Sequence, residues 1–461
     1  MPQPIDAVLN HLDADRPGAI ERLFALLRVP SISTDPAYAS EVARAADMVA
    51  ADARSMGFAT RVHATPGHPV VVGHRKTGGR PHAVFYGHYD VQPVDPLDLW
   101  EAAPFEPRLV ELEPGRSVIR ARGACDDKGQ MMTFLEACRA WIAVTGSLPV
   151  DVSLLLEGEE ENGSESLPAV IEAEKAELMA DVALVCDTGQ WDRETPAVAV
   201  SLRGMFHEGI VVTTADRDLH SGQFGGGALN AIRALTRAVA ALHAEDGSIA
   251  IPGFYDGILE PPADLLAEWR ALGMSAETLL APIGLSEPAG ERGRLLIEQV
   301  TSRPTCDVNG IWGGYQGAGV KTVIPHVAHA KVSFRLVAGQ TPERIQRLFR
   351  EFVRSKLPAD AKVSFVDTKW TTPDWIDWNG RNVALARAAL AEEWGKPAVR
   401  MGIGGSIPIV SDIKTRLGLD PLMIGFGLKD DRVHAPNEKY DLSSFQKGAR
   451  SWARLLGKLA A

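Results

Sequence analysis

The sequence predicts an α/β protein with a mostly parallel sheet flanked by helices, and three observations support this class. The chain has 461 residues, more than one hydrophobic core usually organises, so we expect two domains. Short apolar runs alternate with helical patterns along much of the chain, which is typical of β-α-β units. The middle of the chain follows a different pattern, which indicates a second, smaller domain.

The elements of the larger domain can be followed in chain order. The first 30 residues, MPQPIDAVLNHLDADRPGAIERLFALLRVP, are expected to form an amphipathic helix. Continuous aliphatic runs indicate strands buried on both faces, as in a parallel sheet. These runs cover residues 83–86, 152–156, 182–186 and 422–426. The segments KGQMMTFLEACRAWIAVTG and SESLPAVIEAEKAELM predict helices between them.

Each of the four apolar runs leads to residues that can bind a metal ion. In chain order these are His88 with Asp90, the glutamates of LEGEEENGS, Asp187 and, after a loop, His434. In open α/β sheets ligands bind beyond the carboxyl ends of the strands. Four such endings therefore predict one shared site.

The segment between residues 203 and 375 predicts a smaller α+β domain. MFHEGIVVTT and TVIPHVAHAKVSFRLV indicate half-buried antiparallel strands, and GGALNAIRALTRAVAALHA predicts a long helix, followed by a Pro/Gly-rich connection. His434 and its strand follow this segment. We therefore expect an antiparallel sheet with two helices, inserted into a main domain formed by residues 1–202 and 376–461.

Net charge and several local sequence patterns argue against some classes of protein. The net charge of −11 argues against a nucleic-acid-binding surface. The N-terminus lacks the basic and then apolar order of a signal peptide, and no run reaches eighteen apolar residues. The four cysteines lack paired spacing, which favours reduced thiols and a cytoplasmic location. GGYQGAGVKT fails the P-loop spacing because Val320 separates Gly319 from Lys321.

The ligand types at the strand ends suit a pair of divalent cations, which typically lie about 3.5–4 Å apart and share a ligand. Such cations would compensate the four glutamates that occupy five positions of LLLEGEEENGSES, although a solvated acidic loop is the alternative. Asp90 could orient His88, because a ligating imidazole usually donates its other N–H to a carboxylate. Asp126 and Asp127 of ARGACDDKG could be ligands or a helix N-cap.

Eight motifs resemble, in the same order, those of the di-metal (zinc or manganese) metallopeptidase family. That family contains carnosine dipeptidase, glutamate carboxypeptidase, aminoacylase and acetylornithine deacetylase. The motifs are GHYDVQP, RGACDDKG, EGEEENGS, DLHSGQFGG, KTVIP, FRLVAGQ, GGSIP and HAPNE. The tracts DLHSGQFGG and KTVIP…FRLVAGQ are most similar to the cytosolic nonspecific dipeptidase branch.

The resemblance implies a role for each matching residue of the main domain. The metal ligands would be His88 and Asp187 for the first ion, Glu161 and His434 for the second, and Asp126 for both. Asp90 would orient His88, and the peptide bond between Asp126 and Asp127 would be cis. Glu160 would be the general base, although spacing alone leaves Glu159 open.

In the family the inserted domain acts as a dimerisation or lid domain. His220 would reach the active site of a partner subunit and stabilise the oxyanion there. Arg335 and Thr322 would hold the substrate carboxylate, and Gly405 and Ser406 would line the pocket. A substrate-contacting histidine of the family has no evident counterpart in TTPDWIDWNGR, so side-chain specificity stays open.

The activity implied by the resemblance is hydrolysis of the amide bond of dipeptides or small peptides with a free C-terminal carboxylate. A bridging water would be activated by two divalent metal ions, zinc foremost with manganese or cobalt as alternatives, and by Glu160. Asp187, where deacylases of the family mostly carry glutamate, favours a dipeptidase over an N-acyl-amino-acid deacylase. A non-catalytic metal-binding protein is disfavoured because Glu160 is not needed as a ligand.

Overall fold

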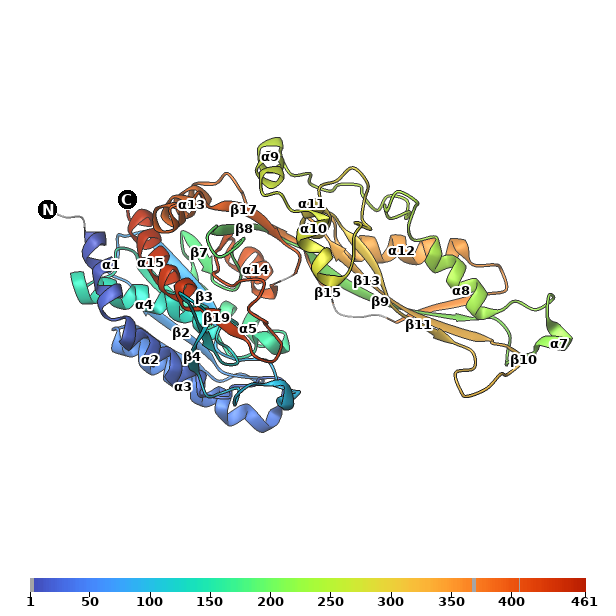
Figure 1. Ribbon diagram of the computed structural model, residues 1–461, viewed down its shortest axis with the longest axis horizontal. Coiled ribbons are helices and arrows are strands. Elements are labelled where there is room, and N and C mark those ends of the chain that lie inside the picture. Colours follow the sequence, from blue (N-terminus) through green and yellow to red (C-terminus); the bar gives the residue numbers. More distant parts are fainter. Residues whose placement is uncertain (1–3, 367–369, 406) are drawn as a thin grey trace. The chain divides into compact units, whose positions relative to one another are not determined.

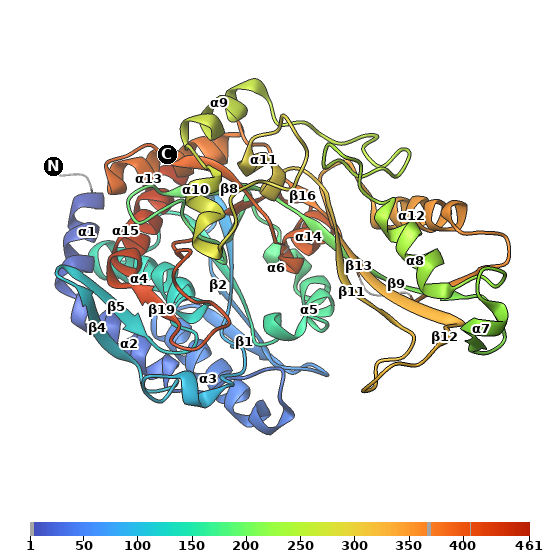
Figure 2. The same ribbon diagram turned by 45° about the vertical axis from the view of Figure 1, so that its right-hand side comes forward.

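The computed structural model describes residues 4–366, 370–405 and 407–461 (Figures 1 and 2). The chain separates into two compact units, and the second lies within the sequence of the first. Unit 1 comprises Met1–Val200, Ile376–Met401 and Ile407–Ala461, and unit 2 comprises Ser201–Trp375 and Gly402–Ser406.

Unit 1 is built on a mixed sheet with a parallel centre. The strands follow the order β1 (Ala59–His63), β2 (Val70–Arg75), β6 (Asp151–Glu157), β3 (His82–His88), β7 (Val182–Val185), β18 (Pro421–Met423) and β8 (Ala197–Leu202). β6, β3, β7 and β18 run parallel, as predicted, whereas the outer pairs are antiparallel. β8 also pairs with β16 (Asp374–Trp375) and β17 (Val399–Ile403).

Helices cover this sheet and complete its core. They include α3 (Ala39–Ser55), α4 (Lys128–Thr145), α5 (Leu167–Ala173), α6 (Lys175–Leu178), α13 (Arg381–Trp394) and α15 (Leu442–Leu459). α1 (Pro4–Ala14), α4 and α15 lie side by side in Figure 1. The ring of Phe85 on β3 stacks on Phe134 of α4 with centroids 3.8 Å apart, and Trp452 of α15 packs edge-on against both. This aromatic contact joins the sheet to α4, whose N-terminus follows Asp126 and Asp127.

The N-terminal segment forms two helices, so the prediction of one helix was wrong. α1 ends at Ala14 and α2 spans Arg16–Leu27, with Pro17 in its first turn. Proline has no N–H and is tolerated only in the first turn of a helix, so a new helix begins there.

Unit 1 also contains a small second sheet. It has the order β19 (Lys439–Asp441), β5 (Arg116–Arg120) and β4 (Arg108–Glu113). β19 pairs antiparallel with β5. The turn that carries Asp126 follows β5, and the loop that carries His434 precedes β19. The pairing of β5 with β19 therefore brings these two loops near each other.

Unit 2 contains the expected antiparallel sheet with two helices on one face. The sheet has the order β11 (Thr305–Gly313), β13 (Val327–Leu336), β9 (Gly204–Thr213) and β14 (Lys362–Val366), and β15 (Trp370–Thr371) also pairs with β9. α8 (Ala231–Ala240) and α12 (Pro342–Lys356) run along this sheet (Figure 2). Their apolar sides pack on alternate residues of β9 and β13, for example Phe349 on Phe334.

Unit 2 has two further features. The Pro/Gly-rich connection contains the short helices α9 (Ala263–Ala271), α10 (Ala276–Leu279) and α11 (Leu296–Thr301), which the sequence did not predict. At one end of the unit, β10 (Leu219–His220) pairs with β12 (Val323–Ile324), and α7 (Ser221–Phe224) follows β10.

Candidate metal centre

Three neighbouring strands of unit 1 end at the same edge of the sheet. His88 is the last residue of β3, and it lies opposite Glu157, the last residue of the parallel strand β6. Asp187 follows β7, which pairs with β3 on its other side. The sequence pattern anticipated this arrangement, because parallel strands place their carboxyl ends together.

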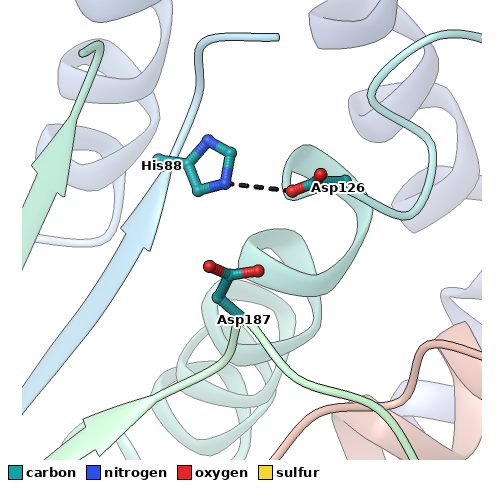
Figure 3. Close-up of side chains that lie close together, drawn as sticks. All are labelled: His88, Asp126 and Asp187. Atoms are coloured by element: carbon teal, nitrogen blue, oxygen red, sulfur yellow. Dashed lines mark hydrogen bonds and ion pairs between the residues drawn. The ribbon is translucent and has the colours of Figure 1, made fainter. Parts of the chain in front are cut away.

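The predicted ligands form two groups of three that have Asp126 in common. His88, Asp126 and Asp187 make one group, and Asp126, Glu161 and His434 make the other, each with its ligand atoms within 4.8 Å of one another. His88, Asp126 and Asp187 point toward a common centre in Figure 3. Two ligand groups that share a carboxylate suit a pair of neighbouring divalent ions.

Asp126 directs one oxygen to each group. Its Oδ1 lies 3.1 Å from Nε2 of His88 and its Oδ2 lies 2.9 Å from Nε2 of His434. Nε2 of His434 is also 3.2 Å from Oε2 of Glu161. The peptide bond between Asp126 and Asp127 is cis, as the resemblance implied. Asp127 turns inward, and its Oδ2 accepts a hydrogen bond of 3.2 Å from the backbone N–H of His88.

Asp90 contacts both sides of the centre. Its Oδ1 lies 3.3 Å from Nδ1 of His88, so it can orient the imidazole. The same carboxylate accepts the backbone N–H groups of Glu160 at 3.2 Å and Glu161 at 3.0 Å. The hydroxyl of Ser33 donates to it at 2.6 Å. Asp90 therefore fixes both a histidine ligand and the start of the acidic turn.

The three glutamates of the acidic turn have different environments. Glu159 is buried, and its Oε2 accepts the backbone N–H of Ser166 at 3.1 Å. Its carboxylate therefore stabilises the turn. Glu161 belongs to a ligand group, and Gln92 donates to its Oε2 at 2.7 Å. Glu160 lies in neither ligand group and has its backbone held by Asp90. These contacts favour Glu160 over Glu159 for work on a substrate.

Two carboxylates of the centre have raised pKa values, which a nearby positive charge would lower. Burial raises the pKa of Asp187 well above its usual range, and repulsion from Asp126 and Asp127 adds to this effect. Burial also raises the pKa of Glu160 to about 7; His88 opposes the shift, whereas Asp126 and Glu161 add to it. Oδ1 of the buried Asp127 has no hydrogen-bond partner among the described residues. Imidazole and carboxylate ligands suit Zn²⁺, Mn²⁺ and related ions, so this donor set fits two divalent metals.

His220 and Thr322, expected to act on substrate, lie together in unit 2. Both are exposed, and Ser221 donates its backbone N–H to the carbonyl of Thr322 at 3.2 Å. Nδ1 of His220 accepts the backbone N–H of Gly222 at 2.9 Å. The proton of the neutral ring therefore resides on Nε2, which is available as a donor.

Arg335 and Gly405 lie in another part of unit 2. Arg335 is half-buried on β13, where its backbone pairs with β11 and β9, and its guanidinium has neither an ion pair nor a hydrogen bond with any described residue. Arg203 donates its backbone N–H to the carbonyl of Gly405 at 3.0 Å and its Nε–H to that of Gly404 at 3.0 Å. Ser406, the other predicted pocket residue, lies outside the described residues.

Sequence reasoning missed Ser33 and Gln92, which contact Asp90 and Glu161. Gln92 lies in the motif GHYDVQP, so its position beside His88 and Asp90 was a usable signal. Ser33 lies almost sixty residues before Asp90, and nothing in its own segment distinguishes it from an ordinary turn serine.

Comparison with known proteins defines the class to which this fold and site belong. The profile of Peptidase family M20/M25/M40 matches residues 84–458, so the chain belongs to this family and is a metallopeptidase. Divalent metal ions are therefore implied for the centre described above.

Individual relatives place the chain near dipeptidases. The chain is 28% identical to the Cys-Gly metallodipeptidase dug1 of Schizosaccharomyces pombe over 484 residues, which cover 100% of this chain and 99% of that protein. It is 27% identical to the Beta-Ala-His dipeptidase of Rattus norvegicus over 386 residues, covering 83% and 77%. These relatives confirm the resemblance to the dipeptidase branch.

Solved structures support the fold over nearly the whole chain. The crystal structure of an M20 family metallo-carboxypeptidase from Sulfolobus solfataricus matches with a TM-score of 0.79 and 27% identity, covering 96% of this chain and 99% of that one. No helix in the described part of the chain is long and apolar enough to cross a lipid bilayer.

Proposed function

We propose that this metallopeptidase hydrolyses the amide bond of dipeptides that have a free C-terminal carboxylate. The observation that carries the proposal is the sharing of Asp126 between two three-residue ligand groups, with Glu160 beside both and part of neither. Zinc is the proposed metal, because two imidazoles complete a carboxylate set that zinc binds well. When bound, two such ions supply a water of lowered pKa and polarise the scissile carbonyl.

The proposed reaction assigns a proton transfer to Glu160. Its carboxylate accepts a proton from the attacking water and then returns that proton to the nitrogen of the leaving amine. Asp90 supports this role because it holds the backbone of Glu160 and faces His88 with the same carboxylate. Asp90 thereby keeps the general base Glu160 and the metal ligand His88 at a fixed distance from each other.

The proposed carboxylate-binding residue is Arg335. Its guanidinium has no acidic partner among the described residues, and it lies near a second arginine, Arg203. Burial, together with the charge of Arg335, lowers the pKa of Arg203 to about 10. The charge of Asp307 opposes this shift in part. The guanidinium of Arg335 has no carboxylate partner of its own, which favours an anionic ligand, and the C-terminus of a peptide can accept two parallel hydrogen bonds from a guanidinium.

We further propose that His220 and Thr322 act on a substrate held by a second copy of the chain. β13 begins at Val327, soon after Thr322, and reaches Arg335 eight residues later, a span of about 27 Å in an extended strand. A dipeptide is only about 7 Å long, so residues at the two ends of this strand cannot contact the same dipeptide. A second copy resolves the conflict by bringing His220 and Thr322 to the site.

A homodimer is also supported by the surface of unit 2. β11 lies at the edge of its sheet and exposes the apolar side chains of Val308, Ile311 and Trp312. An exposed edge with apolar side chains favours pairing with another chain. In the dimer, the free Nε2–H of His220 would donate to the oxygen that becomes negative during hydrolysis, a contact typically worth about 3–4 kcal/mol.

Relatives suggest where to begin with substrates and location. The names of the yeast and rat relatives specify Cys-Gly and β-Ala-His dipeptides, so these two are the first candidates for this chain. All four cysteines are buried free thiols, which is in keeping with the proposed cytoplasmic location.

A substrate panel after metal removal tests the proposed function. The metal-free protein, reconstituted separately with Zn²⁺, Mn²⁺ or Co²⁺, is expected to cleave Cys-Gly and to cleave its C-terminal amide poorly. Release of acetate from N-acetyl amino acids with no cleavage of dipeptides would identify a deacylase instead. Absence of hydrolysis with every metal would leave a metal-binding protein.

A further inference from the structure

A buried carboxylate lies behind the metal centre and belongs to neither ligand group. Glu438 is four residues after His434 and is fully buried. Its Oε1 accepts the backbone N–H groups of Cys125 at 2.9 Å and Asp126 at 3.1 Å. Its Oε2 accepts the backbone N–H of Gly123 at 3.0 Å. Three N–H groups of the turn that carries Asp126 therefore converge on this one side chain.

The fourth partner of Glu438 is a buried arginine. Nη1 of Arg122 donates to Oε2 of Glu438 at 2.7 Å, and both side chains are almost completely enclosed. Nη2 of Arg122 donates to the carbonyl of Pro93 at 2.9 Å, and its guanidinium lies 5.5 Å from the ring centre of Trp100. The ion pair is thus fixed on both sides and holds the carboxylate at its position.

Glu438 also lies at the base of the loop that carries His434. Lys439 donates its backbone N–H to the carbonyl of Asp431 at 2.9 Å, and its Nζ lies 2.5 Å from Oδ1 of the same residue. These contacts close the loop between Asp431 and Lys439. From this closed base, the side chain of Glu438 extends to the turn that carries Asp126.

We propose that Glu438 is a positioning residue that sets metal affinity by fixing Asp126 relative to His434. Asp126 must direct one oxygen to each ligand group, and the distances of 3.1 Å and 2.9 Å to the two histidines leave little room for rotation of the turn. Groups that hold metal ligands typically change metal affinity about 10–100-fold when removed. This inference rests on the two-ion site of the proposed function.

Replacing Glu438 by glutamine changes the hydrogen-bonding pattern of the side chain and leaves its size nearly unchanged. Glu438→Gln keeps the shape of the side chain but turns one acceptor oxygen into an NH₂ group. That group must face either the N–H groups of Cys125 and Asp126 or those of Gly123 and Arg122. Donors would then face donors, so the turn has to shift, and Asp126 shifts with it.

The test is Zn²⁺ binding by the full-length, metal-free protein, measured by competition with a chromophoric chelator. For Glu438→Gln we expect at least one of the two Zn²⁺ ions to bind about 10–100-fold more weakly. Far-ultraviolet circular dichroism and the Tm of the metal-free protein establish that the variant is folded. The matched control is Glu298→Gln in unit 2, because Glu298 is also buried and accepts the backbone N–H of Leu295 at 2.8 Å. The control is expected to bind Zn²⁺ like the unsubstituted protein.

A second variant decides the matter if Glu438→Gln does not fold. Arg122→Met removes the ion pair but leaves the three backbone hydrogen bonds of Glu438, and we expect a smaller loss of Zn²⁺ affinity of about 3–10-fold. Unchanged affinity for both ions in whichever of these variants is folded would overturn the inference. Failure of the unsubstituted protein to bind two Zn²⁺ ions would instead contradict the proposed function.

Discussion

At the scale of single residues, two neighbouring glutamates illustrate how contacts separate chemically identical side chains. Glu159 and Glu160 are adjacent, and both are shielded by the fold, yet only Glu159 has its carboxylate engaged by a backbone N–H group of the turn. Glu160 keeps its carboxylate available beside the ligands Asp126 and Glu161. The fold of the turn gives the two carboxylates different hydrogen-bonding environments. Substituting each glutamate separately therefore compares their roles directly.

Glu160→Gln is expected to lower kcat for dipeptide hydrolysis by about 10²–10⁴-fold, because the amide cannot accept a proton from water. Metal analysis should still find two ions, since Glu160 is outside both ligand groups. Glu159→Gln is the matched control and should keep most of the turnover. Equal turnover of Glu160→Gln and the unsubstituted enzyme would remove the general-base assignment.

Arg335→Met is expected to raise KM for Cys-Gly about 10–100-fold, which corresponds to the loss of a charge-assisted hydrogen bond of about 1.5–3 kcal/mol. The KM for the C-terminal amide of the same dipeptide should change little, because the amide carries no carboxylate charge. Steady-state kinetics with both substrates provide the measurement. A similar rise for both would mean that Arg335 does not recognise the carboxylate.

At the scale of elements, much of the ligand arrangement could be predicted because strands and ligands are adjacent in sequence. The apolar runs before His88, Glu157 and Asp187 correspond to β3, β6 and β7. The run at residues 422–426 forms a strand only at Pro421–Met423, so there the pattern overestimated the element.

Other features depend on tertiary contacts and could not be predicted in the same way. The helices α9, α10 and α11 lie in a segment whose prolines and glycines indicated only a connection. Pro17, by contrast, was a local signal for the break between α1 and α2. Ser33 contacts Asp90 through a chain segment brought to the centre by folding, and no pattern in its own neighbourhood specifies a partner.

The two helices on the sheet of unit 2 provide a prediction about stability. Phe349 of α12 is fully buried against Phe334, so Phe349→Ala is expected to lower the free energy of unfolding of unit 2 by about 3–5 kcal/mol. Hydrogen exchange of the amides of β9 and β13 measures this loss. Val366→Ala, at an exposed position of β14, should have little effect. A loss below about 1 kcal/mol for Phe349→Ala would contradict the assigned core.

At the scale of the whole molecule, the proposal of a second copy makes a prediction about hybrid dimers. Glu160→Gln and His220→Ala should each inactivate a homodimer, because every site then lacks either its base or its oxyanion donor. In a hybrid of the two variants, one site combines the Glu160 of one subunit with the His220 of the other. That hybrid should recover about half of the activity of the unsubstituted dimer.

Hybrid dimers can be isolated with two different affinity tags and assayed directly. If His220 acted within its own subunit, both sites of the hybrid would stay defective and no activity would return. Activity of the His220→Ala homodimer equal to that of the unsubstituted enzyme would remove His220 from the mechanism altogether.

Zn²⁺ titration followed by native mass spectrometry measures whether each chain binds two divalent ions through groups that share Asp126. We expect two ions per chain for the unsubstituted protein. One ion is expected for Asp187→Asn, which leaves the second group complete, and weak binding of both ions is expected for Asp126→Asn. A single ion in the unsubstituted protein, or two tightly bound ions in Asp126→Asn, would contradict binding of two ions through a shared Asp126.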